Sequence, residues 1–404
     1  MQDFSRIYGA ILLIVGTSIG AGMLGLPITT GLNGFLPSIS VFLICGTLML
    51  WSAFLMVEVI CVFKENTNLI SMAKQTIGEK STIFVWIVFL GLFYSLLAAY
   101  LSASGNLFLD VFDIISSNHN LNNIAPMLII FMCSPFLLFG IKYIDSMNQV
   151  TFSILVLSYL LLILLLFKHI DIGYLQTMRG GFFMNSLSIT ILSFAFHPIL
   201  PTISEYLKYN IKDISATIIV GSAIIFIIYV LWEMMLLGVV PIVGDVSISK
   251  AYVNETTFSA LLFPILDSKW ISIAMWIFSF FSILTSFIGV SQASIDFFID
   301  GLRLQKNMRG IFQATLLTYL PPILFSYRFK QSFVIILDYA GVFLILLSGI
   351  LPIIMAYIIR YRMNRRLTYL LLSNKYVLSI GFFIYSNIIV FIIAKNLGYI
   401  NIVT

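Results

Sequence analysis

Charged residues are scarce in this chain. Asp, Glu, Lys and Arg make up only 10% of its 404 residues, whereas soluble proteins carry about 25%. Hydrophobic residues make up 60%, and the mean hydropathy is +1.05. This composition excludes a large soluble domain and predicts a polytopic membrane protein that has the lipid bilayer as its main surroundings.

Cysteines and catalytic motifs are also few. Cys45, Cys61 and Cys133 lie in apolar segments without CxxC spacing, so we expect them to be small core side chains rather than disulfide or zinc ligands. The sequence has no Walker motif, no paired-histidine metal site and no nucleophile elbow. We therefore expect no enzyme activity, no metal, no cofactor, no nucleic-acid partner and no obligate protein partner.

Long apolar segments, by contrast, are abundant. About 20 apolar residues span a bilayer, and no Gly/Ser linker or polar block divides the chain, so residues 1–404 are predicted to form one all-α domain. Two loops, Lys64–Lys80 and Pro241–Ser268, are long enough to hold structure. We expect a short surface helix in the first, and we expect the second to cover part of an external vestibule. The eleven predicted spans are 7–32, 35–62, 82–107, 124–140, 146–167, 186–207, 214–240, 269–299, 310–327, 332–359 and 376–394.

Lys and Arg predict the orientation, because they are enriched in cytoplasmic loops. Most of the 22 Lys and Arg fall on the inside when the N-terminus is cytoplasmic, and the run Arg360–Arg366 is the strongest local signal. The sequence therefore predicts a cytoplasmic N-terminus and an external C-terminus.

Glycine and proline interrupt the first span. Gly16, Thr17, Ser18, Ile19, Gly20, Ala21 and Gly22 are followed closely by Pro27. Glycine disfavours helix by roughly 1 kcal/mol and proline by about 3 kcal/mol. Irregular backbone at membrane depth occurs where it is buried in protein or lines a wet cavity. We predict a broken helix here, and small-residue helix packing is the alternative.

The sixth span contains a second interruption, Ser193-Phe194-Ala195-Phe196-His197-Pro198, followed by Pro201. Glu58 follows Pro27 at nearly the same distance as Glu233 follows Pro201. Breaks in spans 1 and 6 are typical of two inverted five-helix repeats. We predict these repeats at 1–167 and 186–359, with 376–394 as an additional helix.

Two broken helices together suit a zwitterion. A half-helix N-terminus offers free N–H groups to a carboxylate, and a half-helix C-terminus offers carbonyl groups to an ammonium or a cation. The pattern therefore predicts a transporter that carries an amino acid.

Several motifs resemble the hydroxy/aromatic amino acid permeases, which include tryptophan and tyrosine permeases, of the amino acid–polyamine–cation superfamily. The resemblance covers nearly the whole chain and implies a LeuT-like fold with eleven spans and proton-coupled uptake across the inner membrane. Glu233 and Asp338 depart from the family pattern, where glutamine and glycine are more frequent. The motifs are Gly16–Pro27, Ser193–Pro201, Leu231–Glu233, Thr285–Val290, Asp296–Leu302, Leu317–Pro322 and Tyr339–Phe343.

Candidate residues follow from the breaks and from polar groups at membrane depth. Proton-coupling candidates are His197, Glu58 and Glu233, since ionisable groups inside a membrane are costly and often functional, with structural hydrogen bonding as the alternative role. Hydroxyls of the eighth span leave open a serine, threonine or other neutral amino acid carrier coupled to sodium. The substrate-binding candidates are Gly16, Thr17, Ser18, Ile19, Gly20, Ala21, Gly22, Ser193, Phe194, Ala195, Phe196, Tyr94, Ser286 and Gly289.

Overall fold

The computed structural model describes residues 2–64, 68–115, 125–139, 141–254, 256–305, 307–328, 333–365 and 372–400. The regular structure of these residues is entirely helical. Ile124, Gly140, Ser332 and Arg366, which end predicted spans or the basic run, lie outside them. The helices are α1 (Gln2–Ser18), α2 (Ala21–Thr29), η1 (Gly31–Asn33), α3 (Phe35–Phe63), α4 (Leu69–Thr76), α5 (Glu79–Ile115), α6 (Ala125–Phe139), α7 (Ile141–Leu166), η3 (Phe167–His169), α8 (Ile172–Gln176), α9 (Phe183–Ser193), η4 (His197–Ile199), α10 (Leu200–Tyr206), α11 (Ile211–Leu237), α12 (Ile248–Asn254), α13 (Phe258–Leu266), α14 (Lys269–Gly301), α15 (Met308–Arg328), α16 (Phe333–Leu344), η5 (Ile345–Ile350), α17 (Leu351–Tyr361) and α18 (Lys375–Asn396).

Each predicted span coincides with one helix or with two or three consecutive helices. In the described part of the chain, eight helices are long and apolar enough to cross a bilayer, and the bent pair α1–α2 makes a ninth. The other two predicted spans fall on α6, where the apolar stretch Ala125–Ser134 is shorter, and on α15, which contains Pro321 and Pro322. The prediction of an all-α polytopic membrane protein is confirmed.

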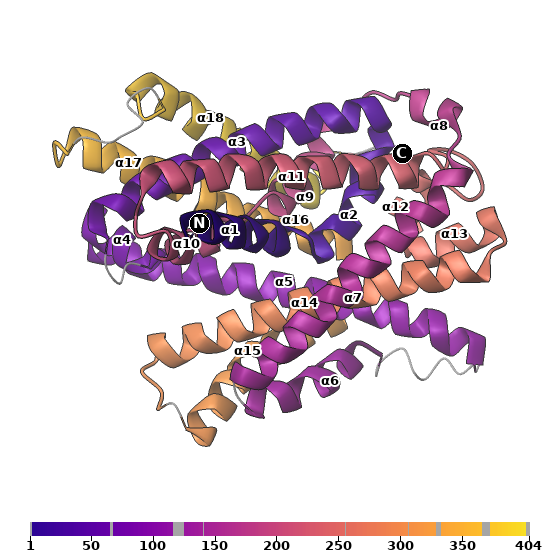
Figure 1. Cartoon of the computed structure of the whole chain (residues 1–404), viewed down its shortest axis with the longest axis horizontal. Coiled ribbons are helices and arrows are strands. Elements are labelled where there is room, and N and C mark those ends of the chain that lie inside the picture. The colour runs from indigo at the N-terminus through magenta and orange to yellow at the C-terminus, as the bar shows by residue number, and fades with distance from the viewer. Residues whose placement is uncertain are drawn as a thin grey trace.

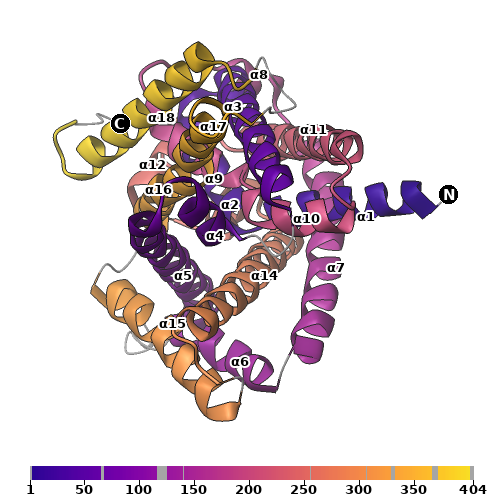
Figure 2. The same ribbon diagram turned by 90° about the vertical axis from the view of Figure 1, so that its left-hand side faces the viewer.

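The long helices pack lengthwise around a buried apolar core. α16 packs against α5 and α9, α14 packs against α7 and α5, and α11 packs against α1 and α3. Short helices mark the two ends of the molecule: α4 and α10 lie at the left of Figure 1, and α12 and α13 at the right. Figure 2 looks onto the end with α4 and α10.

Both loops that were predicted to hold structure contain helices. α4 lies in the first loop and begins at a capping box, in which Asn68 accepts from the Ser71 backbone and the Ser71 side chain accepts from the Asn68 backbone. Such reciprocal bonds satisfy donors that the first turn leaves free. The second loop forms α12 and α13, and Thr257 caps α13.

Both predicted breaks interrupt their helices. α1 ends at Ser18 and α2 begins at Ala21, with a bend of 56° between the two parts of the span. α9 ends at Ser193, and α10 begins only at Leu200 after the short η4. The grouping of the helices into two inverted repeats stays a prediction.

Candidate functional site

The first break is held against α14. The backbone N–H of Ala21 donates to Ser286 Oγ at 2.9 Å. A Cβ atom added to Gly20 would collide with the same Ser286 oxygen. Glycine at position 20 therefore lets the backbone of the first break approach α14 closely. Ser286, one of the predicted substrate-binding residues, lies at this contact.

The second break lies next to the first. Gly22 of α2 faces Ser193 of α9, since a Cβ on Gly22 would lie 3.1 Å from Ser193 Oγ. Ser193 Oγ donates back to the carbonyl of Ile189 at 2.8 Å. Beyond it, the Ala195 N–H donates to the Leu192 carbonyl at 3.2 Å, which closes the last turn of α9 tightly.

Tyr229 of α11 joins the two breaks. Its hydroxyl lies 2.6 Å from the carbonyl oxygen of Ser18 and 2.7 Å from that of Ser193, the last residues of α1 and α9. The side chain of Tyr229 is fully buried. A phenol has one proton to donate, so it cannot fully satisfy both carbonyls. Two helix C-termini therefore converge on one donor and keep acceptor capacity.

The two phenylalanines of the second break are both buried. Phe194 packs edge-on against Tyr229, with ring centroids 5.1 Å apart, and its ring also contacts Phe42 of α3. Phe196 stacks on His197 at 5.6 Å. Phe194 therefore belongs to an aromatic cluster around the bridging tyrosine, and Phe196 covers the histidine ring.

His197 borders a cavity of about 460 Å³. Side chains of α3, α4, α5, α10, α14 and η5 line this cavity, including Met56, Phe93 and Glu205. The imidazole is 1% exposed, and neither ring nitrogen has a hydrogen-bond partner among the described residues. Buried polar atoms are normally satisfied, so the missing partners mark His197 as a candidate for a functional role.

The two predicted glutamates are buried in different places. Glu58 lies on α3 between the cavity-lining residues Met56 and Ile60. Glu233 lies on α11 and contacts the Thr30 hydroxyl at the end of α2, with 2.5 Å between the oxygens. Met56 and Ile60 share one face of α3, and Glu58, two residues from each, lies on the opposite face. The structure therefore turns Glu58 away from the cavity and places Glu233 against the half-helix that follows the first break.

Other residues before the first break face in different directions. Thr17 is exposed, and its hydroxyl donates to the Leu13 carbonyl of its own helix at 2.7 Å. A Cβ on Gly16 would lie 3.4 Å from the Phe152 ring of α7. Ser18 and Ile19 are buried, and Ser18 Oγ has no partner among the described residues. Of the two hydroxyls predicted here, the structure turns that of Ser18 inward.

The last two substrate-binding candidates are Tyr94, which contacts α15, and Gly289, which has open space beside it. Tyr94 donates to the Leu317 carbonyl of α15 at 3.0 Å, so the structure does not bring it to Ser286. A Cβ on Gly289 would have no neighbour within 4 Å. Tyr100, on a different face of α5, interacts with the Ser286 side chain instead.

Tyr229 could not be singled out from the sequence. It is one of 19 tyrosines, and its only local signal is a polar hydroxyl in an apolar span, one turn before Glu233. Among the described residues, no group of three or more His, Cys, Asp and Glu side chains is placed to hold a metal ion. The polar chemistry around the breaks is therefore made by backbone carbonyls, hydroxyls and amides, which suit a small zwitterion.

Known proteins share both the sequence pattern and the fold. Tyrosine-specific transport system 1 of Haemophilus influenzae is 27% identical over 355 residues, which are 86% of this chain and 87% of that protein. A tryptophan-specific transport protein of the same organism is 24% identical and covers 88% of each chain. Glutamine transporter 2 of Aliivibrio fischeri is 25% identical and covers 88% of this chain and 89% of its own.

The fold matches that of MhsT, a LeuT-fold transporter whose crystal structure is a complex with L-phenylalanine. The TM-score is 0.64 at 13% identity, over 96% of this chain and 98% of MhsT. The predicted LeuT-like fold is thereby confirmed. The family model of the tryptophan/tyrosine permeases matches residues 4–393, which also confirms the expectation of a transporter rather than an enzyme. The chain belongs to the tryptophan/tyrosine permease family.

Proposed function

We propose that this protein takes up aromatic amino acids, such as tryptophan or tyrosine, together with protons across the bacterial inner membrane by alternating access. One observation carries the proposal: the carbonyls of Ser18 and Ser193 end two half-helices and share the single donor of Tyr229. A substrate ammonium adds the donors that this pair of carbonyls lacks. The names of the relatives support tyrosine and tryptophan as cargo.

The substrate carboxylate, in this proposal, meets the start of α2. Gly20, Ala21 and Gly22 form this start, where a partial positive charge favours an anion. The Ser286 hydroxyl accepts from the Ala21 N–H at this start, and the buried Ser18 precedes Ala21 by three residues. The aromatic side chain of the cargo then packs among the neighbouring rings, for which offset or edge geometry is favourable.

The 460 Å³ cavity gives the release route. It lies at the end that holds α4 and α10, the side that the Lys and Arg distribution predicts to be cytoplasmic. Release occurs through this cavity, past His197, in the arrangement shown. The candidates for carrying the coupled proton are His197, Glu58 and Glu233. The membrane potential supplies about 2.3 kcal/mol per charge per 100 mV, which supports more than tenfold accumulation.

Purified protein in proteoliposomes tests this function. We expect radiolabelled tryptophan or tyrosine to accumulate when an inward proton gradient is imposed without sodium. Competition by each of the twenty amino acids then ranks the cargo, and aromatic amino acids are expected to compete best. Uptake that needs sodium and ignores the proton gradient would contradict proton coupling.

A second candidate function is a carrier for smaller neutral amino acids such as serine, threonine or glutamine, coupled to sodium. The glutamine transporter among the relatives favours it, as does the hydroxyl of Ser286 beside the first break. The same competition panel decides, because serine or glutamine would then displace tryptophan.

A further inference from the structure

Asp338 and Lys395 form a buried ion pair between α16 and α18. Their side chains are 1% and 7% exposed, and the Lys395 ammonium donates to Asp338 Oδ2. Burying charges costs several kcal/mol per ion unless they are paired, and ionisable residues at membrane depth are functional candidates. This pair is separate from the three residues proposed above to carry the proton.

The backbone of Asp338 also holds α9, the half-helix that leads into the second break. Ser188 Oγ of α9 donates to the carbonyl oxygen of Asp338 at 3.0 Å. One turn further along α16, a Cβ added to Gly341 would collide with Ser188 Oγ. The two helices are therefore in close contact here, with α18 packed against both of them.

The contact between α9 and α16 lies towards the end of the molecule that has the smaller cavity. The 460 Å³ cavity reaches Leu344, which follows Asp338 by six residues, or about 9 Å along a helix. Towards α12 and α13, the beginning of α16 borders a cavity of only about 50 Å³, through Phe333 and Val334. The Asp338–Lys395 pair thus lies between the two cavities, where α9 covers α16.

Among the residues that the structure describes, few other ionisable groups face Asp338. Lys395 comes from α18 and Tyr252 from α12; burial, together with the nearby Asp338 carboxylate, raises the pKa of Tyr252 to about 12. α2 and α9 carry no ionisable side chain. The two tyrosines in the middle of α5, Tyr94 and Tyr100, contact Leu317 and Ser286. Lys395 is thus the charged partner that decides whether Asp338 binds a proton.

We propose that Asp338 and Lys395 form a proton-binding pair that opens to the outside when α9 separates from α16. This inference rests on the proton-coupled uptake proposed above. One proton from external water binds the Asp338 carboxylate. The Lys395 ammonium, in the last turn of α18 before the exposed residues 397–400, then turns to water as long basic side chains do at helix ends. Re-formation of the ion pair, as in the state shown, releases that proton inward.

The double variant Asp338→Asn/Lys395→Gln tests the pair without leaving a lone buried charge. We expect exchange of labelled for unlabelled substrate at equal pH to persist, because exchange needs no net proton movement. Accumulation driven by one pH unit, which supports about tenfold concentration, should be lost. A double variant that accumulates substrate like wild type would overturn the proposal.

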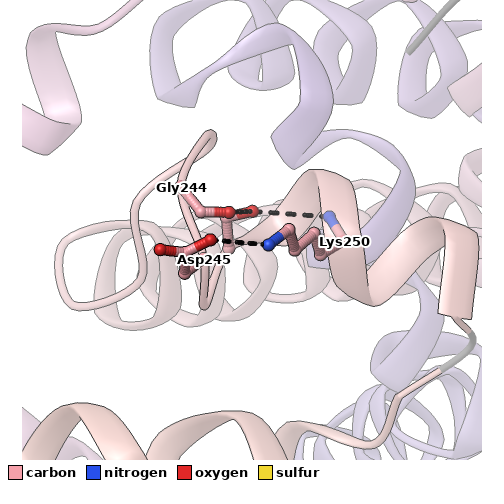
Figure 3. Close-up of polar contacts among 4 residues, drawn as sticks. Gly244, Asp245 and Lys250 are labelled. Atoms are coloured by element: carbon pink, nitrogen blue, oxygen red, sulfur yellow. Dashed lines mark hydrogen bonds and ion pairs between the residues drawn. The ribbon is translucent and has the colours of Figure 1, made fainter.

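The exposed pair Asp245–Lys250 provides a matched control. Asp245 lies in the loop before α12 and Lys250 in the first turn of α12, with their charged atoms 2.8 Å apart (Figure 3). The Lys250 hydrogen bond lowers the pKa of Asp245. Asp245→Asn/Lys250→Gln should leave both exchange and accumulation unchanged. If the wild-type protein itself shows no proton-driven uptake in this assay, the proposed function fails, whatever the variants do.

A second variant keeps the charges and the fold. Lys395→Arg holds the carboxylate with a planar guanidinium that favours two-point binding, so protons should compete less well for Asp338. We expect the external pH that gives half-maximal uptake to become more acidic. An unchanged pH profile in this variant would overturn the proposal even if the doubly neutral variant fails to fold.

Discussion

The hydroxyl of Tyr229 lies 2.6 Å from the carbonyl oxygen of Ser18 and so ties α11 to the last residue of α1. The same hydroxyl reaches the last residue of α9 at 2.7 Å. A single side chain therefore sets the spacing of the two breaks, although all three segments are far apart in sequence. This relationship makes the site sensitive to one oxygen atom.

Tyr229→Phe removes that oxygen and keeps the ring. We expect the apparent affinity for the amino acid to fall about 3- to 10-fold, since a typical hydrogen bond contributes about 1 kcal/mol. Binding is measured by scintillation proximity with labelled tryptophan or tyrosine. Tyr385→Phe is the control, because Tyr385 is also buried and donates to the Leu48 carbonyl at 2.9 Å, away from the breaks. Equal losses in both variants would contradict a specific role for Tyr229.

Gly20 and Ser286 should show strong coupling. Gly20→Ala brings a Cβ against Ser286 Oγ, and overpacking of this kind costs about 1–3 kcal/mol. Ser286→Ala alone loses the bond from the Ala21 N–H and the interaction with Tyr100. The Ser286 Cβ lies 3.8 Å from the added carbon, so removal of the hydroxyl restores the space.

We therefore expect the double variant Gly20→Ala/Ser286→Ala to match Ser286→Ala in melting temperature and uptake. Gly289→Ala should keep the wild-type melting temperature, because its Cβ would meet open space. A double variant as impaired as Gly20→Ala would show that the close contact is not the cause.

His197 should affect coupling more than binding. Both of its ring nitrogens lack a protein partner among the described residues, and it borders the larger cavity. We expect His197→Ala to bind substrate within about threefold of wild type, a change below 1 kcal/mol, and to lose most gradient-driven accumulation. Glu58→Gln is tested in parallel. Normal accumulation in both variants would reduce these residues to structural roles.

The predicted orientation is tested by labelling single cysteines with a membrane-impermeant maleimide in whole cells, after Cys45, Cys61 and Cys133 are replaced by Ala. We expect Lys250→Cys, on α12, to react from outside. Lys74→Cys, on α4, should react only after the cells are opened. Both positions are exposed, so accessibility depends on the membrane side alone. The reverse result would invert the orientation and move the larger cavity to the outside.

Local composition was enough to predict both breaks. Glycine and proline weaken a helix wherever it packs, so the breaks around Gly20 and Pro198 could be read without any tertiary information. It was harder to predict which face of each helix points towards the site. Tyr94 and Tyr100 are six residues apart, which turns them about 120° away from one another on a helix. Only Tyr100 meets Ser286, whereas Tyr94 meets α15.

Pairings between distant helices could not be predicted. Asp338 and Lys395 lie on helices whose relative register depends on packing, and hydropathy marks both segments as membrane spans without saying which faces meet. Phe194 is one of 36 phenylalanines, and its place beside Tyr229 follows from the fold alone. The sequence therefore predicts the backbone part of the site better than its side-chain part.

The last prediction concerns the protonation state of Glu233, which shares the Thr30 hydroxyl with a backbone carbonyl. The Thr30 hydroxyl lies 2.6 Å from the Leu26 carbonyl oxygen and 2.5 Å from Glu233 Oε1. It has one proton, and a carbonyl can only accept. If Thr30 donates to Leu26, the contact with Glu233 is a hydrogen bond only when the carboxyl group donates. We therefore expect Glu233 to be a neutral acid in this conformation.

Infrared difference spectroscopy measures this proton directly. At neutral pH, the wild-type spectrum minus that of Glu233→Gln should contain the carbonyl band of a protonated carboxyl group. Thr30→Val should shift this band, because the acid loses its acceptor, while Thr47→Val on the exposed face of α3 should leave it unchanged. Glutamine can also donate through its amide, so Glu233→Gln should keep a melting temperature near that of wild type. A difference spectrum with only carboxylate bands would show that Thr30 donates to an ionised Glu233 and leaves the Leu26 carbonyl to its other donors.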